Sequence, residues 1–183
     1  TLLILYIVYE NHTRNKELLK YAQTDALTGL YNKETTEQLT DELLSEDENK
    51  YHAFLILDVD CFKQINDIYG HAVGDRVLQK FGKLLKSTFR EGDILGRIGG
   101  DEFVVIMKNI QTKDIAMKKA EELLAKTQAY KIDELKGNNI SISIGISTAP
   151  QDGDCYMDLY KRADQALYQA KRSGKARVCN YFS

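Results

Sequence analysis

The sequence has few cysteines and little net charge. Its three cysteines, Cys61, Cys155 and Cys179, form no C-x-x-C pair and show no metal-ligand spacing. That absence excludes the usual zinc and redox motifs and favours a reducing compartment. A net charge of −2 provides no broad basic surface for a nucleic-acid backbone. We therefore expect an ordinary globular domain that has no nucleic-acid polymer as a partner.

Long hydrophobic runs are also lacking. The apolar run at residues 1–9 is too short to span a bilayer, which needs roughly 20 apolar residues. It also lacks the basic leader and cleavage site of a signal peptide. It is either the end of a transmembrane helix that begins upstream or the apolar start of a linker helix. We expect an N-terminal linker helix over residues 1–21, a folded domain over residues 22–183, and a cytoplasmic location at a membrane anchor.

The apolar residues that are present make up 43% of the chain, which is enough for one core. Their spacing predicts strands at 52–57, 94–98, 103–107, 140–147 and 177–182, and helices at 33–44, 62–69, 73–89, 113–129 and 157–172. Asn32 is placed to cap the first helix. The alternation at 140–147 predicts a strand with one buried face. This order of elements predicts an α+β fold in which helices cover a central sheet.

Acidic residues follow two of the predicted strands. Asp58 and Asp60 end the first strand, and Asp101 and Glu102 follow the Gly99-Gly100 pair. A Gly-Gly pair between apolar runs predicts a hairpin, whose turn we expect to need positive φ. If the strands are neighbours, three or four carboxylates converge, and hard oxygen ligands of this kind suit Mg²⁺. Taken alone, a strand-end aspartate is more often a turn or helix cap.

Four segments of the chain resemble, in order, the motifs of the GGDEF domain family. Residues 97–103 contain the literal G-G-D-E-F string, and residues 58–75 resemble the family pattern D-x-D-x-F-K-x-x-N-D-x-x-G-H-x-x-G-D. Residues 25–32 resemble D-x-L-T-G-L-x-N, and residues 170–175 resemble A-K-x-x-G-[RK]. The likeness covers roughly residues 22–183. It implies a mainly antiparallel sheet of the nucleotide-cyclase and polymerase-palm type, with a ferredoxin-like core.

The resemblance also implies a site that can be placed residue by residue. Mg²⁺, or Mn²⁺ in its place, would be held by Asp58, the carbonyl of Val59 and Asp101. Catalysis would involve Asp101, Glu102 and Lys63. Phe62 and Lys63 would bind phosphate, and Lys171 and Lys175 would bind the outer phosphates of the substrate. Asn66 and Asp75 would bind its guanine, with His71 nearby. Phosphoryl transfer of this type depends on in-line geometry and charge neutralisation.

A second site is implied by an R-x-x-D motif. Arg90 and Asp93 form this motif, and five residues, 94–98, separate Asp93 from Gly99, a spacing that resembles the family's inhibitory product site. The alternative is a helix-end arginine with a turn aspartate. Three positions depart from the family pattern: Lys33 replaces a common arginine, and Lys175-Ala176 replace a common Arg-Asn pair.

The implied activity is that of a diguanylate cyclase, which joins two GTP molecules into cyclic di-GMP with release of two pyrophosphates. Each domain would hold one GTP, so a homodimer would be needed for catalysis, and the product would inhibit through Arg90 and Asp93. The alternative is a catalytically silent module that binds GTP or cyclic di-GMP for an attached partner.

Overall fold

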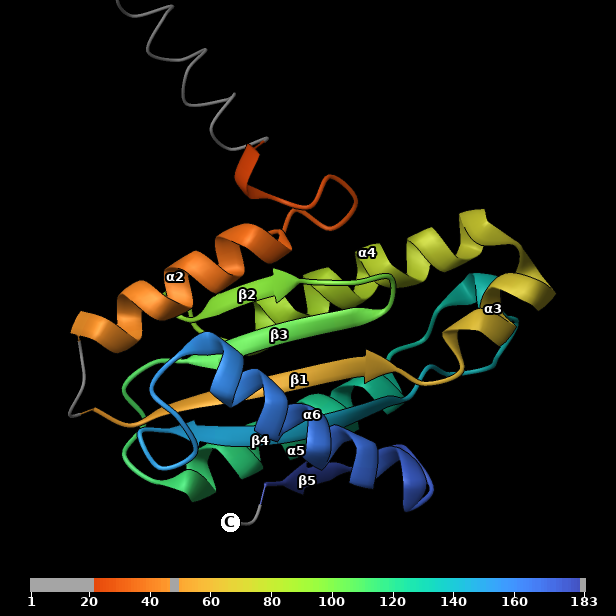
Figure 1. Ribbon diagram of the computed structural model, residues 1–183. Coiled ribbons are helices and arrows are strands. Elements are labelled where there is room, and N and C mark those ends of the chain that lie inside the picture. Colours follow the sequence, from red (N-terminus) through yellow and green to blue (C-terminus); the bar gives the residue numbers. More distant parts are fainter. Residues whose placement is uncertain (1–21, 47–49, 182–183) are drawn as a thin grey trace, which may run out of the picture.

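Residues 22–46 and 50–181, described by a computed structural model, form a five-stranded sheet with helices on both faces (Figure 1). The elements in chain order are α2 (Lys33–Glu46), β1 (His52–Val59), α3 (Phe62–Tyr69), α4 (His71–Thr88), β2 (Ile94–Arg97), β3 (Glu102–Met107), α5 (Lys113–Ala129), η1 (Asp133–Leu135), β4 (Ile142–Ala149), α6 (Tyr156–Arg172) and β5 (Val178–Asn180). The strand order is β2-β3-β1-β4-β5. Only the β4–β5 pair among these neighbours is parallel. The predicted α+β fold with a mainly antiparallel sheet is confirmed.

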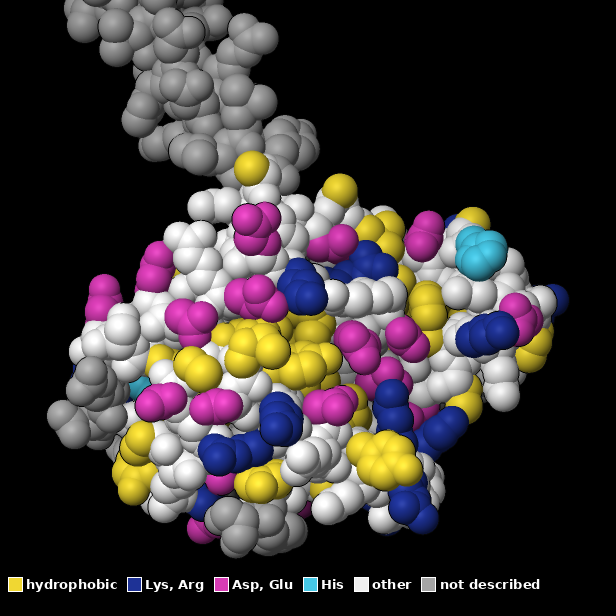
Figure 2. All heavy atoms as spheres, viewed as in Figure 1, with side chains coloured by type: hydrophobic (Ala, Val, Ile, Leu, Met, Phe, Trp, Pro, Cys, Tyr) yellow, Lys and Arg dark blue, Asp and Glu magenta, His cyan; other side chains and the backbone are white. Residues whose placement is uncertain are grey.

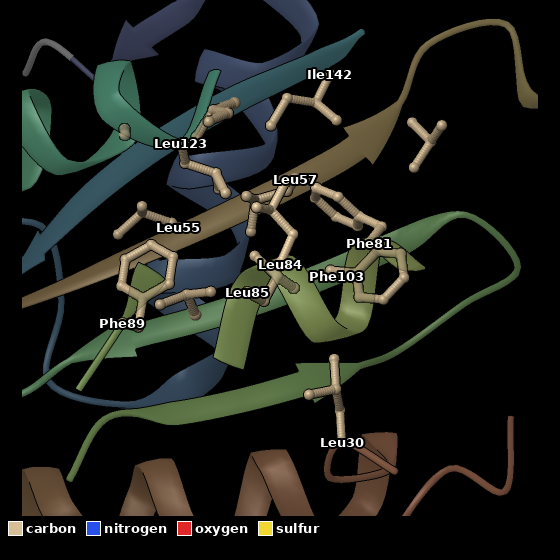
Figure 3. Packing of buried hydrophobic residues seen from close by; sticks show 14 of the residues in the cluster. Leu30, Leu55, Leu57, Phe81, Leu84, Leu85, Phe89, Phe103, Leu123 and Ile142 are labelled. Atoms are coloured by element: carbon tan, nitrogen blue, oxygen red, sulfur yellow. The ribbon is translucent and has the colours of Figure 1, made fainter. Parts of the chain in front are cut away.

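The larger core lies between the sheet and the helices α4 and α5. Odd-numbered residues of β1 and β3 point into it, as Figure 3 shows for Leu55, Leu57 and Phe103. Phe103 meets Phe81 of α4 edge-on, with ring centroids 4.9 Å apart. Each of these side chains is removed from water, which stabilises the fold by roughly 1.5–3 kcal/mol per large side chain.

The opposite face of the sheet is covered by α2 and α6. Phe54 and Ile56 of β1 pack there against Leu159 and Leu167 of α6, and α6 crosses in front of β1 and β4 in Figure 1. The helix comes so close that a Cβ at Gly145 of β4 would lie 2.1 Å from the carbonyl oxygen of Ala163. Even-numbered residues of β1 and β3 therefore face α2 and α6, and Asp58 and Glu102 are among them.

The structure corrects several predictions of the strands and helices. The strand predicted at 140–147 is β4, which begins two residues later and is buried on both faces, because α5 lies on one side and α6 on the other. β1 continues through Asp58 and Val59, since both pair with β4. The helix predicted at 73–89 is α4, which starts at His71 because Gly70, with φ of 85°, ends α3 just before it. The helical turn η1 was not predicted.

Other predictions are confirmed or lie outside the described residues. Asn32 does cap α2, since its Oδ1 accepts a hydrogen bond of 2.9 Å from the Thr35 amide. The linker helix predicted over residues 1–21 lies outside the described part of the chain. No helix within residues 22–46 or 50–181 is long and apolar enough to cross a membrane.

Candidate active site

The site begins with two carboxylates on neighbouring strands. Asp58 of β1 is directly opposite Glu102 of β3 in the antiparallel ladder, so both side chains lie on the α6 face of the sheet. Burial raises the pKa of Asp58; Lys171 opposes this, and Asp101 and Asp60 add to it. Burial, followed by the charge of Asp58, also raises the pKa of Glu102. This end of the sheet therefore carries negative charge that the protein does not fully compensate.

The hairpin between β2 and β3 delivers Asp101 to the same place. The amide of Val59 donates a hydrogen bond of 3.2 Å to the Asp101 carbonyl, which ties the turn to the end of β1. The expectation of positive φ at the two glycines is wrong, because neither is among the positive-φ glycines of the described chain. A Cβ at Gly99 would instead lie 2.9 Å from Oε2 of Glu102. A side chain at this position would therefore displace the Glu102 carboxylate from where it lies.

Arg97 supports the hairpin, and the sequence analysis assigned it no role. Its Nε and Nη2 donate to the Gly100 carbonyl at 3.2 and 2.8 Å, and its Nη1 donates to both oxygens of Asp25 at 3.1 Å. Asp25 also accepts bonds from the amide and hydroxyl of Thr28. The turn before Asp101 is thereby fastened to the segment at residues 22–32.

A lysine from α6 partly neutralises the acidic end. Lys171 Nζ lies 2.6 Å from Oδ2 of Asp58, with side chains 36% and 11% exposed. Figure 2 shows acidic side chains gathered near the end of β1 and basic ones beside them, towards the end of α6. The family resemblance implied that Lys171 binds the outer phosphates, but this ion pair was not predicted.

Of the three or four carboxylates that we expected to converge, three do so and Asp60 does not. Asp60 turns into a buried network instead: Ser143 Oγ donates to its Oδ1 at 2.7 Å, and Ser141 Oγ and the Ala176 amide donate to its Oδ2 at 2.8 and 3.1 Å. Asp60 is 6% exposed. Both Asp60 oxygens are therefore occupied by hydrogen bonds within the protein. The other three carboxylates, Asp58, Asp101 and Glu102, are called the open acidic set.

The open acidic set fits a divalent cation in its donor chemistry. Its side chains offer hard oxygen donors and carry uncompensated charge, as Mg²⁺ requires. The oxygens of Asp58, Asp101 and Glu102 do not form a compact group that would surround a cation. Within the described residues, the grouping of three ligand atoms within 4.8 Å of one another is at Asp154, Cys155 and Asp158, around the start of α6. The set can therefore hold a cation only in part, with the remaining positions left for water and phosphate oxygens.

The residues predicted to bind guanine lie on α3 and α4. Oδ1 of Asn66 is buried and has no hydrogen-bond partner among the described residues. A Cβ at Gly74 would lie 1.9 Å from that oxygen and 3.2 Å from Cζ of Phe62. A buried acceptor without a partner is costly, and a ligand donor would remove that cost. His71 and Asp75 are exposed at the start of α4, and Lys63 is exposed on α3.

The R-x-x-D residues are at the other end of β2, about 13 Å along the strand from the hairpin. Asp93 accepts bonds from Arg90 Nε at 3.1 Å, from the Arg90 amide at 3.3 Å and from the Lys108 amide at 3.1 Å. Arg90 Nη2 also donates to the Lys108 carbonyl. The two residues line a surface pocket with Thr88, Phe89, Met107, Asn109, Ile110, Gln111, Ile115 and Lys119.

These features define a class of protein: an α+β domain of the nucleotide-cyclase type, with an acidic site where a strand end meets a hairpin. The sequence matches the family described as "Diguanylate cyclase, GGDEF domain" over residues 22–177. The chain belongs to this family.

Individual relatives agree with that assignment. The chain is 38% identical to response regulator PleD of Caulobacter vibrioides over 93% of its own length and 39% of the relative's. It is 37% identical to diguanylate cyclase A of Treponema denticola, over 90% and 46% of the two lengths. The chain thus spans less than half of each of these two relatives. The crystal structure of the coiled coil and GGDEF domain of DgcB from Caulobacter crescentus, in complex with c-di-GMP, superposes with a TM-score of 0.87 at 25% identity, covering 96% of this chain and 94% of that one.

Proposed function

We propose that this chain is an active diguanylate cyclase that converts two GTP molecules into cyclic di-GMP and two pyrophosphates. The observation that carries the proposal is the acidic pair Asp58–Glu102, set beside Asp101 and facing Lys171 of α6. An unbalanced acidic site with a lysine at its rim is suited to phosphate chemistry that involves a divalent cation. The unpaired Oδ1 of Asn66 is a hydrogen-bond acceptor. It supports guanine as the base, because guanine carries N–H donors on its base-pairing edge.

In the proposed reaction, the 3′-oxygen of one GTP forms a bond to the α-phosphorus of the other. The bond from that phosphorus to the pyrophosphate oxygen breaks, and the pyrophosphate leaves. Glu102, or its neighbour Asp101, accepts the proton of the attacking hydroxyl. The raised pKa of Glu102 makes it a better proton acceptor than an ordinary carboxylate.

The remaining residues bind and neutralise. Asp58 and Asp101, with the Val59 carbonyl, would hold Mg²⁺ or Mn²⁺, whose chemistry there is to offset phosphate charge and align the reacting oxygens. Lys63, Lys171 and Lys175 bring positive charge to the phosphates, with Phe62 nearby. Asn66 and Asp75, with His71 close by, select guanine. The Lys171–Asp58 pair keeps that ammonium at the rim of the site.

Catalysis requires two copies of the domain, because one domain holds one GTP and the product contains two phosphodiester links. The test is to incubate the protein with GTP and Mg²⁺, identify the product by mass spectrometry, and repeat the assay over a dilution series. We expect cyclic di-GMP and a specific activity that falls on dilution. GTP binding without any cyclic product would favour the alternative, a silent GTP- or cyclic di-GMP-binding module.

Feedback inhibition through Arg90 and Asp93 is a separate part of the proposal. Asp93 is held by three bonds within the protein, whereas the Arg90 side chain is 60% exposed. An incoming guanine or phosphate would reach the exposed arginine first and would compete with its bonds to Asp93 and to the Lys108 carbonyl. Added cyclic di-GMP should inhibit the wild type and have little effect on Arg90→Ala, while both keep the same KM for GTP. Equal inhibition of the two proteins would rule out this site. A cytoplasmic location at a membrane anchor also stays a prediction.

A further inference from the structure

The loop between α6 and β5 has an unfavourable backbone that something must hold in place. Lys175 and Ala176 both have positive φ, 61° and 48°. This region disfavours residues that carry a Cβ, and it is tolerated better by asparagine. The loop therefore needs contacts with other parts of the chain to stabilise it.

Asp60 contributes to that stabilisation, beside the bonds from the Lys175 amide to the Ala170 carbonyl and from Arg177 Nε to the Lys175 carbonyl, both 3.1 Å. Its Oδ2 accepts hydrogen bonds from the Ala176 amide at 3.1 Å and from Ser141 Oγ at 2.8 Å, while Ser143 Oγ holds its Oδ1 at 2.7 Å. The Asp60 amide also donates to the Ser141 carbonyl at 2.9 Å. One carboxylate thus joins the end of β1, the start of β4 and the loop. We call this set the Asp60 clamp.

The clamp determines where one ammonium group lies. Lys175 immediately precedes the clamped amide, and its Nζ lies 3.2 Å from Sγ of Cys61, the residue that follows Asp60. Lys175 therefore folds back over the segment that joins β1 to α3, within the electrostatic influence of Asp60 and Asp58. Loss of the clamp would leave the Ala176 amide without its acceptor, directly beside the residue whose side chain carries the ammonium group.

We infer that Asp60 is a positioning residue for the substrate: it fixes the 173–177 loop so that Lys175 meets the outer phosphates of a guanine nucleotide. The inference rests on the proposed function, which places GTP in this site. It separates two aspartates that the sequence motif pairs: Asp58 faces the site, and Asp60 acts through the loop. Both Asp60 oxygens are already engaged, which argues against a role as a cation ligand.

The test compares binding of two nucleotides in the presence of Mg²⁺, measured by calorimetry. 3′-Deoxy-GTP carries the outer phosphates but lacks the attacking hydroxyl, and GMP lacks the outer phosphates. Asp60→Ala and Lys175→Ala should each weaken 3′-deoxy-GTP binding by about tenfold, as expected for one charge-assisted contact, and change GMP binding by less than about twofold. The double variant should bind no more weakly than the worse single variant, because both changes remove the same contact.

A matched variant distinguishes the clamp from a cation ligand. In Asp60→Asn, the amide oxygen can still accept from Ala176 and Ser141, and its Nδ2 can donate to Ser143 Oγ. We expect this variant to bind 3′-deoxy-GTP within about threefold of wild type. If Asp60→Ala does not fold, Ser141→Ala serves in its place. It removes one bond to Oδ2 and should weaken 3′-deoxy-GTP but not GMP.

Three results would overturn the inference: additive losses in the double variant, equal losses for GMP and 3′-deoxy-GTP, or no loss at all. These results are separable from a failure of the proposed function. A wild type that binds 3′-deoxy-GTP but makes no cyclic di-GMP would refute the proposed reaction and leave the test of the clamp intact.

Discussion

Two carboxylates at the end of β1, two residues apart, have opposite surroundings. Asp60 is held by two serine hydroxyls and a backbone amide. Asp58 has one lysine as its hydrogen-bond partner, and its pKa is raised by burial and by the nearby Asp101 and Asp60. The same contrast separates Asp25, bonded to Thr28 and Arg97, from Glu102.

This difference shows where the chain has been arranged for folding and where for binding. Buried charges that serve the fold have their hydrogen bonds satisfied, since an unpaired buried charge is costly. Groups left without full partners are retained at a cost in stability, and such groups concentrate at functional sites. This criterion is consistent with the proposed roles of Asp58, Glu102 and the Oδ1 of Asn66 in the site, and it indicates a supporting role for Asp60 and Asp25.

The largest expected effect is on activity at the open acidic set. Asp58→Ala and Asp101→Asn should each lower the rate of cyclic di-GMP formation by roughly a thousandfold or more, because each removes a proposed cation ligand. Their melting temperatures should stay within a few degrees of wild type. Product is measured by chromatography, with Asp114→Asn, an exposed carboxylate of α5, as the control. Near wild-type turnover in either variant would remove that residue from the site.

The reverse pattern is expected at Asp60. Asp60→Ala leaves Ser141, Ser143 and the Ala176 amide without their acceptor, which should lower the free energy of unfolding by about 2–4 kcal/mol. Denaturant unfolding measures this value, with Asp58→Ala as the comparison. An equal loss of stability in both variants would contradict the division between site and support.

Much of the fold could be predicted from the sequence because local patterns determine it. The apolar run of β1, the helical spacing of α4 and the Asn32 cap depend on neighbouring residues, and all three were predicted. The burial of both faces of β4 was not, because it depends on how α5 and α6 pack on the sheet, which the pattern within the strand does not reveal. The parallel pairing of β5 with β4 joins residues 34 apart in the sequence, such as Ile144 and Val178, and local patterns do not predict it either.

The candidate site was predicted from motifs, and its contacts were not. The motif placed Asp58, Asp60, Asp101 and Glu102 together, yet a side chain's partners depend on tertiary packing. Asp60 finds Ser141 and Ser143 more than 80 residues away in sequence. The reason for Gly99 was also wrong, since the constraint comes from the Glu102 side chain and not from φ. The positive φ of Ala176 was not predicted from the sequence either.

A smaller effect is expected at the guanine end, where the group without a partner is neutral. In Gly74→Ala, the new methyl group would collide with Oδ1 of Asn66 and force that side chain to turn. Binding of 3′-deoxy-GTP should weaken by about tenfold, as for one lost hydrogen bond in a buried site. Calorimetry measures it, with Gly92→Ala as the control, because no atom lies within 4 Å of a Cβ there. Unchanged affinity would show that Asn66 does not contact the base.

The smallest expected effect is on the pH dependence of stability. At neutral pH, removing the charge of Glu102 and removing that of Asp25 should change the stability in opposite directions. Burial and the charge of Asp58 raise the pKa of Glu102 above its ordinary 4.5. Its favourable contribution to stability is therefore fully present below about pH 4.5 and is lost as the pH rises through the raised value. Glu102→Gln should match wild type in acid and be slightly more stable at neutral pH, by less than about 1 kcal/mol because solvent screens this partly exposed group.

Asp25 provides the matched case with the opposite sign. Burial alone would raise the pKa of Asp25, but the bonds from Thr28 and Arg97 outweigh it and lower the pKa below 3.8. Its contribution is present above that value and is lost as the pH falls, so Asp25→Asn should be less stable than wild type at neutral pH and approach it in acid. The measurement is a series of thermal melts of wild type, Glu102→Gln and Asp25→Asn between pH 3.5 and 7.5, in steps of about half a pH unit. If the melting temperatures of both variants shift in the same direction at neutral pH, the ionised Glu102 does not destabilise the fold and the contrast with Asp25 is wrong.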